Sequence, residues 1–314
     1  MRRRGQRKSG GVGQSESENM IEIQEVTHAR LEPAIAGFPG LFAARTAGPD
    51  ALDARYTLGE VELRMMAVHR PRPADLMLLA VLAALAGPAG REPNEALGDC
   101  ALVRALECAP AAAGVGTIVV KTSRARVLSE CGVRDGGSTR KALRESLSRL
   151  TGLTAIVRRG PQEVSMHLLS YSINESTGEL AVALSPRLSA ALLGGRHVRL
   201  ELREMRELSE HARVLYARLC AWIDPSRTRR VGLNALAVYL WSDPPSDGAI
   251  ERKRRQRLRA ALLELGRLAG WHVVHDALGR QYTISRPAGK SVTFAGKTVT
   301  FAGKTVTPES AISM

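Results

Sequence analysis

The sequence predicts an α+β protein of two tandem winged-helix domains, each a helix-turn-helix plus a β-hairpin, with flexible N- and C-terminal tails. Two observations predict this. An order of helix, turn, basic helix and hairpin occurs twice, and a Leu- and Ala-rich composition with 4% aromatics favours helical cores. At 314 residues there is room for two cores. We expect a disordered basic arm over 1–25, a first winged-helix domain over 26–193, a second, DNA-binding one over 194–287 with its linker at Gly194-Gly195, and a flexible repeat-containing tail over 288–314.

The part of the chain before the first basic helix has strand and helix patterns. Tyr56–His69 alternates in polarity and predicts one or two strands. Pro73–Ala86 is largely apolar between a Pro-Ala-Asp start and a Gly-Pro stop, which predicts a buried helix. We expect a second helix over Glu95–Cys108 and a short strand over Thr117–Lys121.

The first basic helix is expected after two capping signals. Ser123 can cap a short helix that ends at Gly132, and Ser138 can cap the longer one. In that helix Leu143, Leu147 and Leu150 share one side. For its polar side we predict contacts with DNA by Ser138, Arg140, Lys141, Arg144 and Ser148. An ordinary amphipathic helix is the alternative interpretation of this segment.

Three strands are expected next: Leu153–Val157, Val164–Leu169 and Glu179–Leu184. A basic turn joins the first two. Its residues Arg158 and Arg159 could reach the DNA backbone as a wing, and a plain solvated turn explains them equally well.

The second unit repeats this order. Ser209–Ile223 predicts an amphipathic helix and Leu233–Leu240 a shorter one, which Asp-Pro-Pro ends. Asp247 can cap the Arg-rich helix that follows. Trp271–Val274 and Gln281–Ser285 predict the closing hairpin.

The Arg-rich segment Ile250–Leu268 is the most informative one. At about 100° per residue, one stripe of the helix is apolar and the opposite stripe is cationic. The apolar stripe consists of Leu258, Ala261, Leu262, Leu265 and Ala269. Six cations occupy positions 252–259, with no interspersed Glu to pair with them. A helix that docks by its C-terminal half and offers guanidinium groups at its N-terminal half suits a DNA groove.

From this helix we predict seven residues that contact DNA: Arg252, Lys253, Arg254, Arg255, Gln256, Arg257 and Arg259. Arginines bind phosphates or guanine, and Gln256 suits an adenine edge. The alternative is a solvated cationic surface of a helix.

The net charge of +14 and the pI of about 10.4 call for a polyanionic partner. Nucleic acid is the first candidate and an anionic membrane surface the second. The cations cluster on expected helices, which favours nucleic acid. The apolar run Leu76–Ala86 is too short to cross a bilayer, and the basic start lacks the apolar run of a signal peptide, so we expect no membrane association and a cytoplasmic protein.

Catalytic and metal sites are not indicated. The four cysteines, Cys100, Cys108, Cys131 and Cys220, have no zinc spacing, and we expect reduced thiols. No two histidines stand two apart, as a rolling-circle nickase would require, so Tyr216 and Tyr239 are expected in the core or at its rim. The Gly-Lys-Ser and Gly-Lys-Thr strings of the repeated tail lack the P-loop glycine. We expect no enzyme, no metal and no cofactor.

Several strings resemble the iteron-binding replication initiator RepC of IncQ-type broad-host-range plasmids. They are Pro39–Phe42, Gly87–Pro88, His197–Arg199, Arg218–Pro225, Arg252–Arg257, Gly270–Trp271 and Ile284–Pro287. The resemblance covers Val26–Pro287, and its first half matches mainly in element order.

This resemblance implies a protein that binds direct repeats, or iterons, in double-stranded plasmid origin DNA. It also implies help in opening an AT-rich region and recruitment of the plasmid-encoded helicase and primase, without a catalytic centre or nucleotide cofactor. Self-association stays open. A winged-helix transcriptional regulator that binds an operator is the alternative function, and a nickase is the third.

Overall fold

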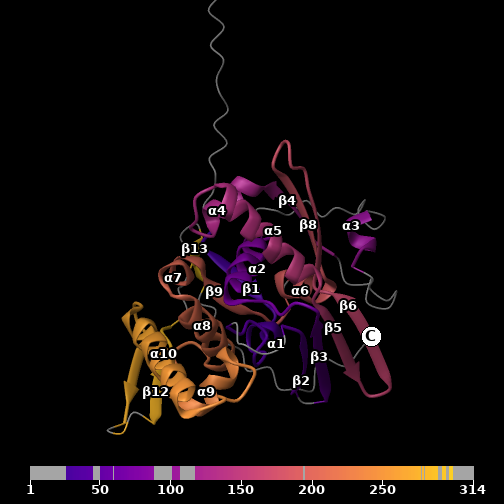
Figure 1. Ribbon diagram of the computed structural model, residues 1–314. Coiled ribbons are helices and arrows are strands. Elements are labelled where there is room, and N and C mark those ends of the chain that lie inside the picture. Colours follow the sequence, from indigo (N-terminus) through magenta and orange to yellow (C-terminus); the bar gives the residue numbers. More distant parts are fainter. Residues whose placement is uncertain are drawn as a thin grey trace, which may run out of the picture.

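The computed structural model describes residues 26–44, 50–58, 60–87, 101–106, 117–193, 195–276, 278 and 280–288, and the backbone of 292–294 and 297–299. It is a mixed α+β fold (Figure 1). The helices are α1 Pro33–Ala36, α2 Pro73–Leu85, α3 Ala101–Arg104, α4 Arg124–Glu130, α5 Gly137–Thr151, α6 Pro186–Leu192, α7 Leu202–Glu207, α8 Glu210–Trp222, α9 Leu233–Leu240 and α10 Gly248–Arg267.

The strands form small antiparallel sheets. Within each sheet, strands named next to each other are neighbours in space. They are β1 His28–Leu31 with β9 Val198–Glu201; β2 Leu52–Leu58, β3 Val61–Ala67, β5 Thr154–Arg159 and β6 Gln162–His167; β4 Val119–Ser123, β8 Glu179–Leu184 and β7 Leu169–Ile173; β10 Thr228–Gly232, β12 Gln281–Ser285 and β11 His272–His275; and β13 Val292–Phe294 with β14 Lys297–Val299.

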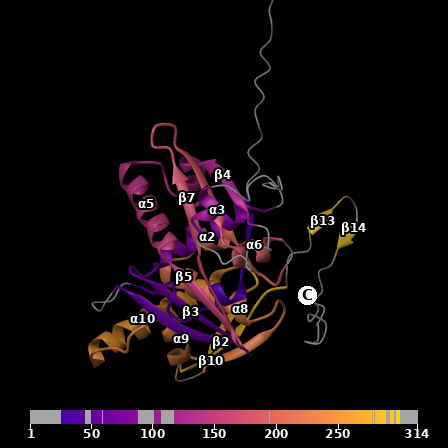
Figure 2. The same ribbon diagram turned by 90° about the vertical axis from the view of Figure 1, so that its right-hand side faces the viewer.

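The described chain contains a repeat of element order, but in its first copy β5 and β6, which hold the hairpin expected from the sequence, are inserted between α5 and β7. The first copy runs α2, β4, α4, α5 and the hairpin β7–β8, and the second runs α8, β10, α9, α10 and the hairpin β11–β12. In both copies the last strand lies between the other two, in the orders β4-β8-β7 and β10-β12-β11. Figure 2 shows the two basic helices on the same side of the molecule, α5 above α10.

Helix α2 is the centre of the hydrophobic core. It is apolar nearly all round, and residues from Leu76 to Ala84 are buried without a break. A helix of this kind must be covered on every side. Its neighbours include β1, α4, α5, α7 and α8, so it joins the two copies.

The two copies share one hydrophobic cluster, which includes Leu79 of α2, Leu147 of α5, Leu215 of α8 and Leu262 of α10. The length of the chain leaves room for two cores, whereas the described buried residues form this one cluster. Strand β1 pairs with β9 across the expected boundary at 193/194. The amide of Ala44 also donates to the Leu240 carbonyl at 2.9 Å. These contacts cross the expected boundary, and the division into two domains at 193/194 stays a prediction.

Most long helices lie where the sequence predicts them. Ser123 caps α4 by accepting from the amide of Arg126, and Gly132 follows α4 with a φ of +76°. The sequence missed the short elements β1, α6, α7, β9 and β10, and it merged β6 with β7. Each missed element has at most seven residues, too few for a clear period.

The expected arm over 1–25 lies outside the described residues, as do Cys100, Cys108 and Gly194. So does most of the expected helix Glu95–Cys108, of which Ala101–Arg104 is helical. In the tail, the described backbone forms the β13–β14 hairpin. No helix among the described residues is long and apolar enough to span a membrane.

Candidate nucleic-acid interface

Helix α10 begins at a strong local signal. The Asp247 carboxylate accepts from the amides of Ala249 and Ile250, both at 2.8 Å. The bond from Ile250 is the main reason why the pKa of Asp247 lies below its usual value. Such a cap satisfies amides that no helical carbonyl can reach, and it confirms the predicted helix start.

The C-terminal half of α10 anchors it. Leu258, Ala261, Leu262 and Leu265 are buried, and α10 packs on α8 and α9. The predicted stripe is confirmed at these four positions, whereas Ala269 lies beyond the helix and is exposed.

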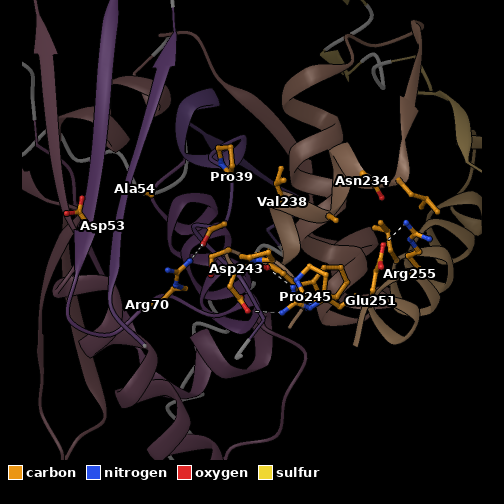
Figure 3. Close-up of a pocket in the computed structure, with 18 residues that line it drawn as sticks. Pro39, Asp53, Ala54, Arg70, Asn234, Val238, Asp243, Pro245, Glu251 and Arg255 are labelled. Carbon is orange, nitrogen blue, oxygen red and sulfur yellow. Dashed lines mark hydrogen bonds and ion pairs between the residues drawn. The ribbon is translucent and has the colours of Figure 1, made fainter. Parts of the chain in front are cut away.

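A cavity of about 580 Å³ lies beside the N-terminal half of α10 (Figure 3). Its lining includes Asp53 and Arg70 from the first half of the chain, Val238 of α9, and Glu251 and Arg255 of α10. Because this cavity lies between the N-terminal half of α10 and the residues from the first half of the chain, that part of the helix is not packed tightly against them.

Two of the six predicted cations of α10 have acidic partners. Arg254 is half-buried: its guanidinium donates to the Asp243 carbonyl at 2.6 Å and carboxylate at 2.9 Å, and it lies 5.5 Å from the Trp241 ring centroid. Arg255 pairs with Glu251, one turn earlier, at 2.6 Å. The expectation of cations without acidic partners is therefore wrong for these two. Arg254 braces the helix against the core.

The remaining predicted residues of α10 are free to meet a ligand. All are exposed, and the structure describes no acidic partner for the four cations among them. They are Arg252, Lys253, Gln256, Arg257 and Arg259. Four unpaired cations on one exposed helix make a strongly positive surface, which we call the α10 surface.

The first basic helix, α5, is also placed as predicted, with Leu143, Leu147 and Leu150 buried. Ser138 does not cap it. The helix starts one residue earlier, and the Thr139 hydroxyl accepts from the amide of Gly136 at 2.9 Å. All five residues predicted to contact DNA are exposed: Ser138, Arg140, Lys141, Arg144 and Ser148.

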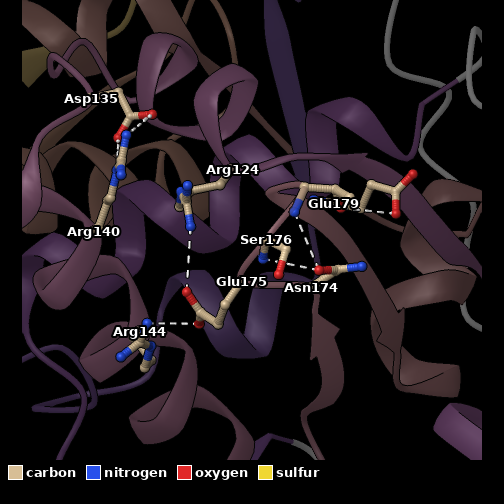
Figure 4. A network of polar contacts seen from close by, with 9 residues as sticks. Arg124, Asp135, Arg140, Arg144, Asn174, Glu175, Ser176 and Glu179 are labelled. Atoms are coloured by element: carbon tan, nitrogen blue, oxygen red, sulfur yellow. Dashed lines mark hydrogen bonds and ion pairs between the residues drawn. The ribbon is translucent and has the colours of Figure 1, made fainter.

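The arginines of α5 differ from those of α10 because acids neutralise them. Arg140 makes two bonds to Asp135, at 2.6 and 3.2 Å, and these bonds lower the pKa of Asp135. Arg144 lies 2.6 Å from Glu175 (Figure 4). Only Lys141, among the predicted cations of this helix, has no acidic partner in the described part of the chain.

Arg149 of α5 serves the core. Its side chain is 11% exposed and makes two bonds, at 2.7 and 2.8 Å, to the fully buried carboxylate of Asp75 in α2. These bonds raise the pKa of Arg149. A buried pair of this geometry fixes α5 on α2 and excludes Arg149 from any ligand.

Arg158 and Arg159 occupy a different place from the one expected. They are exposed at the end of β5, but the β5–β6 hairpin belongs to the sheet with β2 and β3. Arg158 is the cross-strand neighbour of Glu62 on β3 and of Glu163 on β6. The hairpin that joins β4 beside α5 is β7–β8, whose tip is Asn174–Gly178. The sequence assigned the wing to β5–β6, whereas β7–β8 is the hairpin that pairs with β4, because strand pairing is not local; DNA contact by Arg158 and Arg159 stays a prediction.

Sequence reasoning also missed a basic edge strand. Arg227 precedes β10, and Arg229 and Arg230 lie within it; all three are exposed, with no acidic partner among the described residues. Arg229 lies 5.9 Å from the Trp222 ring centroid. The Thr-Arg-Arg-Val-Gly string alternates too briefly to mark a strand, although its charge alone could have singled it out.

The predicted core tyrosines are confirmed. Tyr216 is 2% exposed, and its hydroxyl accepts from the amide of Glu201 at 3.1 Å. Burial raises the pKa of Tyr216. Tyr239 is half-buried under the guanidinium of Arg218, which lies 4.5 Å from its ring centroid. Within the described residues, no cluster of three or more His, Cys, Asp or Glu side chains could hold a metal ion.

Comparisons with known proteins agree with this architecture. The family model of replication protein C (RepC) matches residues 23–288. Crystal structures of domains 2 and 3 of RctB resemble the chain at 13% identity, and both cover 82% of it. For one structure the TM-score is 0.52 with 97% of that chain covered. For a selenomethionine derivative it is 0.50 with 98% covered. At this identity the likeness concerns the fold alone. No curated protein matches the sequence.

Proposed function

This chain belongs to the replication protein C (RepC) family and is a plasmid replication initiator, and we propose that it acts by binding direct repeats in double-stranded origin DNA. The observation that carries the proposal is the α10 surface. Four exposed cations that have no acidic partner among the described residues, together with Gln256, lie at the N-terminal half of a helix whose C-terminal half is anchored in the core. This arrangement suits a major groove, where arginine and glutamine side chains read base edges.

We propose further that both copies of the repeated element order are winged helices, with α5 and α10 as their recognition helices. The order of a winged helix is a helix-turn-helix followed by a hairpin whose tip lies beside the second helix. The position of α5 and α10 on one side of the molecule supports binding to one side of a duplex (Figure 2). Recognition helices that enter successive major grooves lie about 34 Å apart. A single chain could then bind its DNA site with both helices, and the site would not have to be palindromic.

The later steps are proposed from the family role. Bound copies would bend the origin and promote opening of an AT-rich region, where deformation costs least. The plasmid-encoded helicase and primase would then be recruited. We propose no catalytic centre and no nucleotide cofactor, since Tyr216 is buried and Tyr239 is covered.

A DNase footprint on the parent plasmid tests this function. We expect protected direct repeats at the origin. A single protected inverted repeat at a promoter would instead favour an operator-binding regulator. Incubation with supercoiled origin DNA and magnesium should leave the DNA uncut, and a nicked product covalently bound to tyrosine would contradict the absence of catalysis.

A further inference from the structure

Glu175, at the tip of the β7–β8 hairpin, is an acid that lies between two arginines. Its two carboxylate oxygens engage two different guanidinium groups (Figure 4). Oε1 lies 2.6 Å from Nη2 of Arg144 on α5, and Oε2 lies 3.4 Å from Nη1 of Arg124 at the start of α4. Glu175 and Arg144 are about half exposed, at 50% and 55%. The acid therefore stands at the surface where α5 would meet a duplex.

The hairpin tip holds Glu175 in place. The Asn174 side chain accepts from the amides of Ser176 and Thr177, at 3.0 and 3.2 Å. Gly178 has a φ of +76°, and its carbonyl accepts from the amide of Arg124 at 2.8 Å. The turn is thus closed on itself and bonded to α4, so that the carboxylate is positioned before any ligand arrives.

The two copies of the repeated unit consequently differ in free charge. Both arginines on the exposed side of α5 are held by acids, whereas four cations of α10 have no acidic partner in the part of the chain that the structure describes. A phosphate that approached Arg144 would meet the negative charge of Glu175, and like charges brought together are unfavourable. A guanine edge offers two neutral acceptors. Arg144 can bind it with its remaining donors, because a guanidinium has five N–H groups.

We propose that Glu175 is a specificity-determining residue: by holding Arg144 and Arg124 it makes the first unit reject plain phosphate backbone and accept only a site with the matching base. The inference rests on the proposed binding of duplex DNA. The α10 surface would supply most of the salt-dependent affinity. The first unit would supply discrimination through a repulsive element, which is one way in which interfaces become specific.

The test compares Glu175→Gln with Glu207→Gln in the full chain. Glu207 of α7 is 57% exposed, it also pairs with an exposed arginine, Arg203, at 3.4 Å, and its substitution changes the net charge equally. Affinities would be measured at several salt concentrations, for a duplex with the footprinted repeat and for a scrambled duplex of the same length. Thermal unfolding would verify that both variants fold.

We expect Glu175→Gln to tighten binding of the scrambled duplex roughly two- to fivefold. It should also steepen the salt dependence by about one unit of slope. The repeat should gain less, so the ratio of the two affinities falls, while Glu207→Gln leaves that ratio unchanged. In an Arg144→Ala background, Glu175→Gln should no longer change the ratio.

Other outcomes would overturn the inference. If Glu175→Gln acts like Glu207→Gln, or tightens both duplexes equally, the acid affects bulk charge alone. If it weakens the repeat and leaves the scrambled duplex unchanged, Glu175 contacts the base itself. A wild-type chain that bound neither duplex would overturn the proposed function, a result separate from these.

Discussion

Removal of two free cations from α10 should lower both affinity and its salt dependence. We choose Arg252→Ala with Arg257→Ala, because both side chains are exposed and have no acidic partner among the described residues. Each phosphate contact on B-DNA contributes about 0.9 to the slope of log K against log salt. If each arginine binds one phosphate, the slope falls by about 1.8. At 0.1 M salt this corresponds to roughly a 60-fold loss of affinity, or about 2.4 kcal/mol.

The assay is a gel-shift titration of the repeat duplex between about 0.05 and 0.3 M salt. The control is Arg55→Ala with Arg203→Ala, which removes equal charge from side chains that are 62% and 89% exposed on β2 and α7. The control should keep the wild-type slope. A wild-type slope in the Arg252/Arg257 variant, with the fold intact, would refute phosphate binding by α10.

Three further outcomes concern stability. Arg254→Ala should lower the free energy of unfolding, measured by urea denaturation, by about 1–3 kcal/mol, because the hydrogen bonds to Asp243 are lost. A variant as stable as the wild type would contradict the role of Arg254 in holding α10 on the core. Leu262→Ala should cost about 2–5 kcal/mol, since Leu262 is 1% exposed; a loss under 1 kcal/mol would place it outside the core. The pKa of Asp247 is lowered in the folded protein, so its ionised cap stabilises the fold above the ordinary pKa of 3.8, and this stability is lost as the pH falls through the pKa of the folded state. Asp247→Asn keeps a cap without that pH dependence. The difference in unfolding free energy between wild type and variant should therefore shrink between pH 5 and 3, and a difference that does not change with pH would count against the ionised cap.

The contrast between α5 and α10 explains why a high net charge is a poor guide to individual contacts. The chain carries +14, yet Arg140, Arg144 and Arg149 are all engaged by acids. Two helices that are both rich in arginine can therefore differ in the positive charge that they present to a ligand. The free cations of α10 make it the better candidate for phosphate binding.

The sequence by itself determined the long helices and their buried sides, and the caps at Ser123 and Asp247. The period of Leu143, Leu147 and Leu150 and the cap at Asp247 depend on residues a few positions apart, so their outcome is decided locally. The family strings also sufficed for the RepC assignment, which the family model confirms.

Only the tertiary structure decided which hairpin joins β4, that β1 pairs with β9, and which arginines are neutralised. Glu175 reaches Arg144 and Arg124 because strands that are far apart in sequence pair in one register. Backbone pairing and ion pairs depend on which segments the shared core brings together, and no periodicity within a short segment encodes that partner.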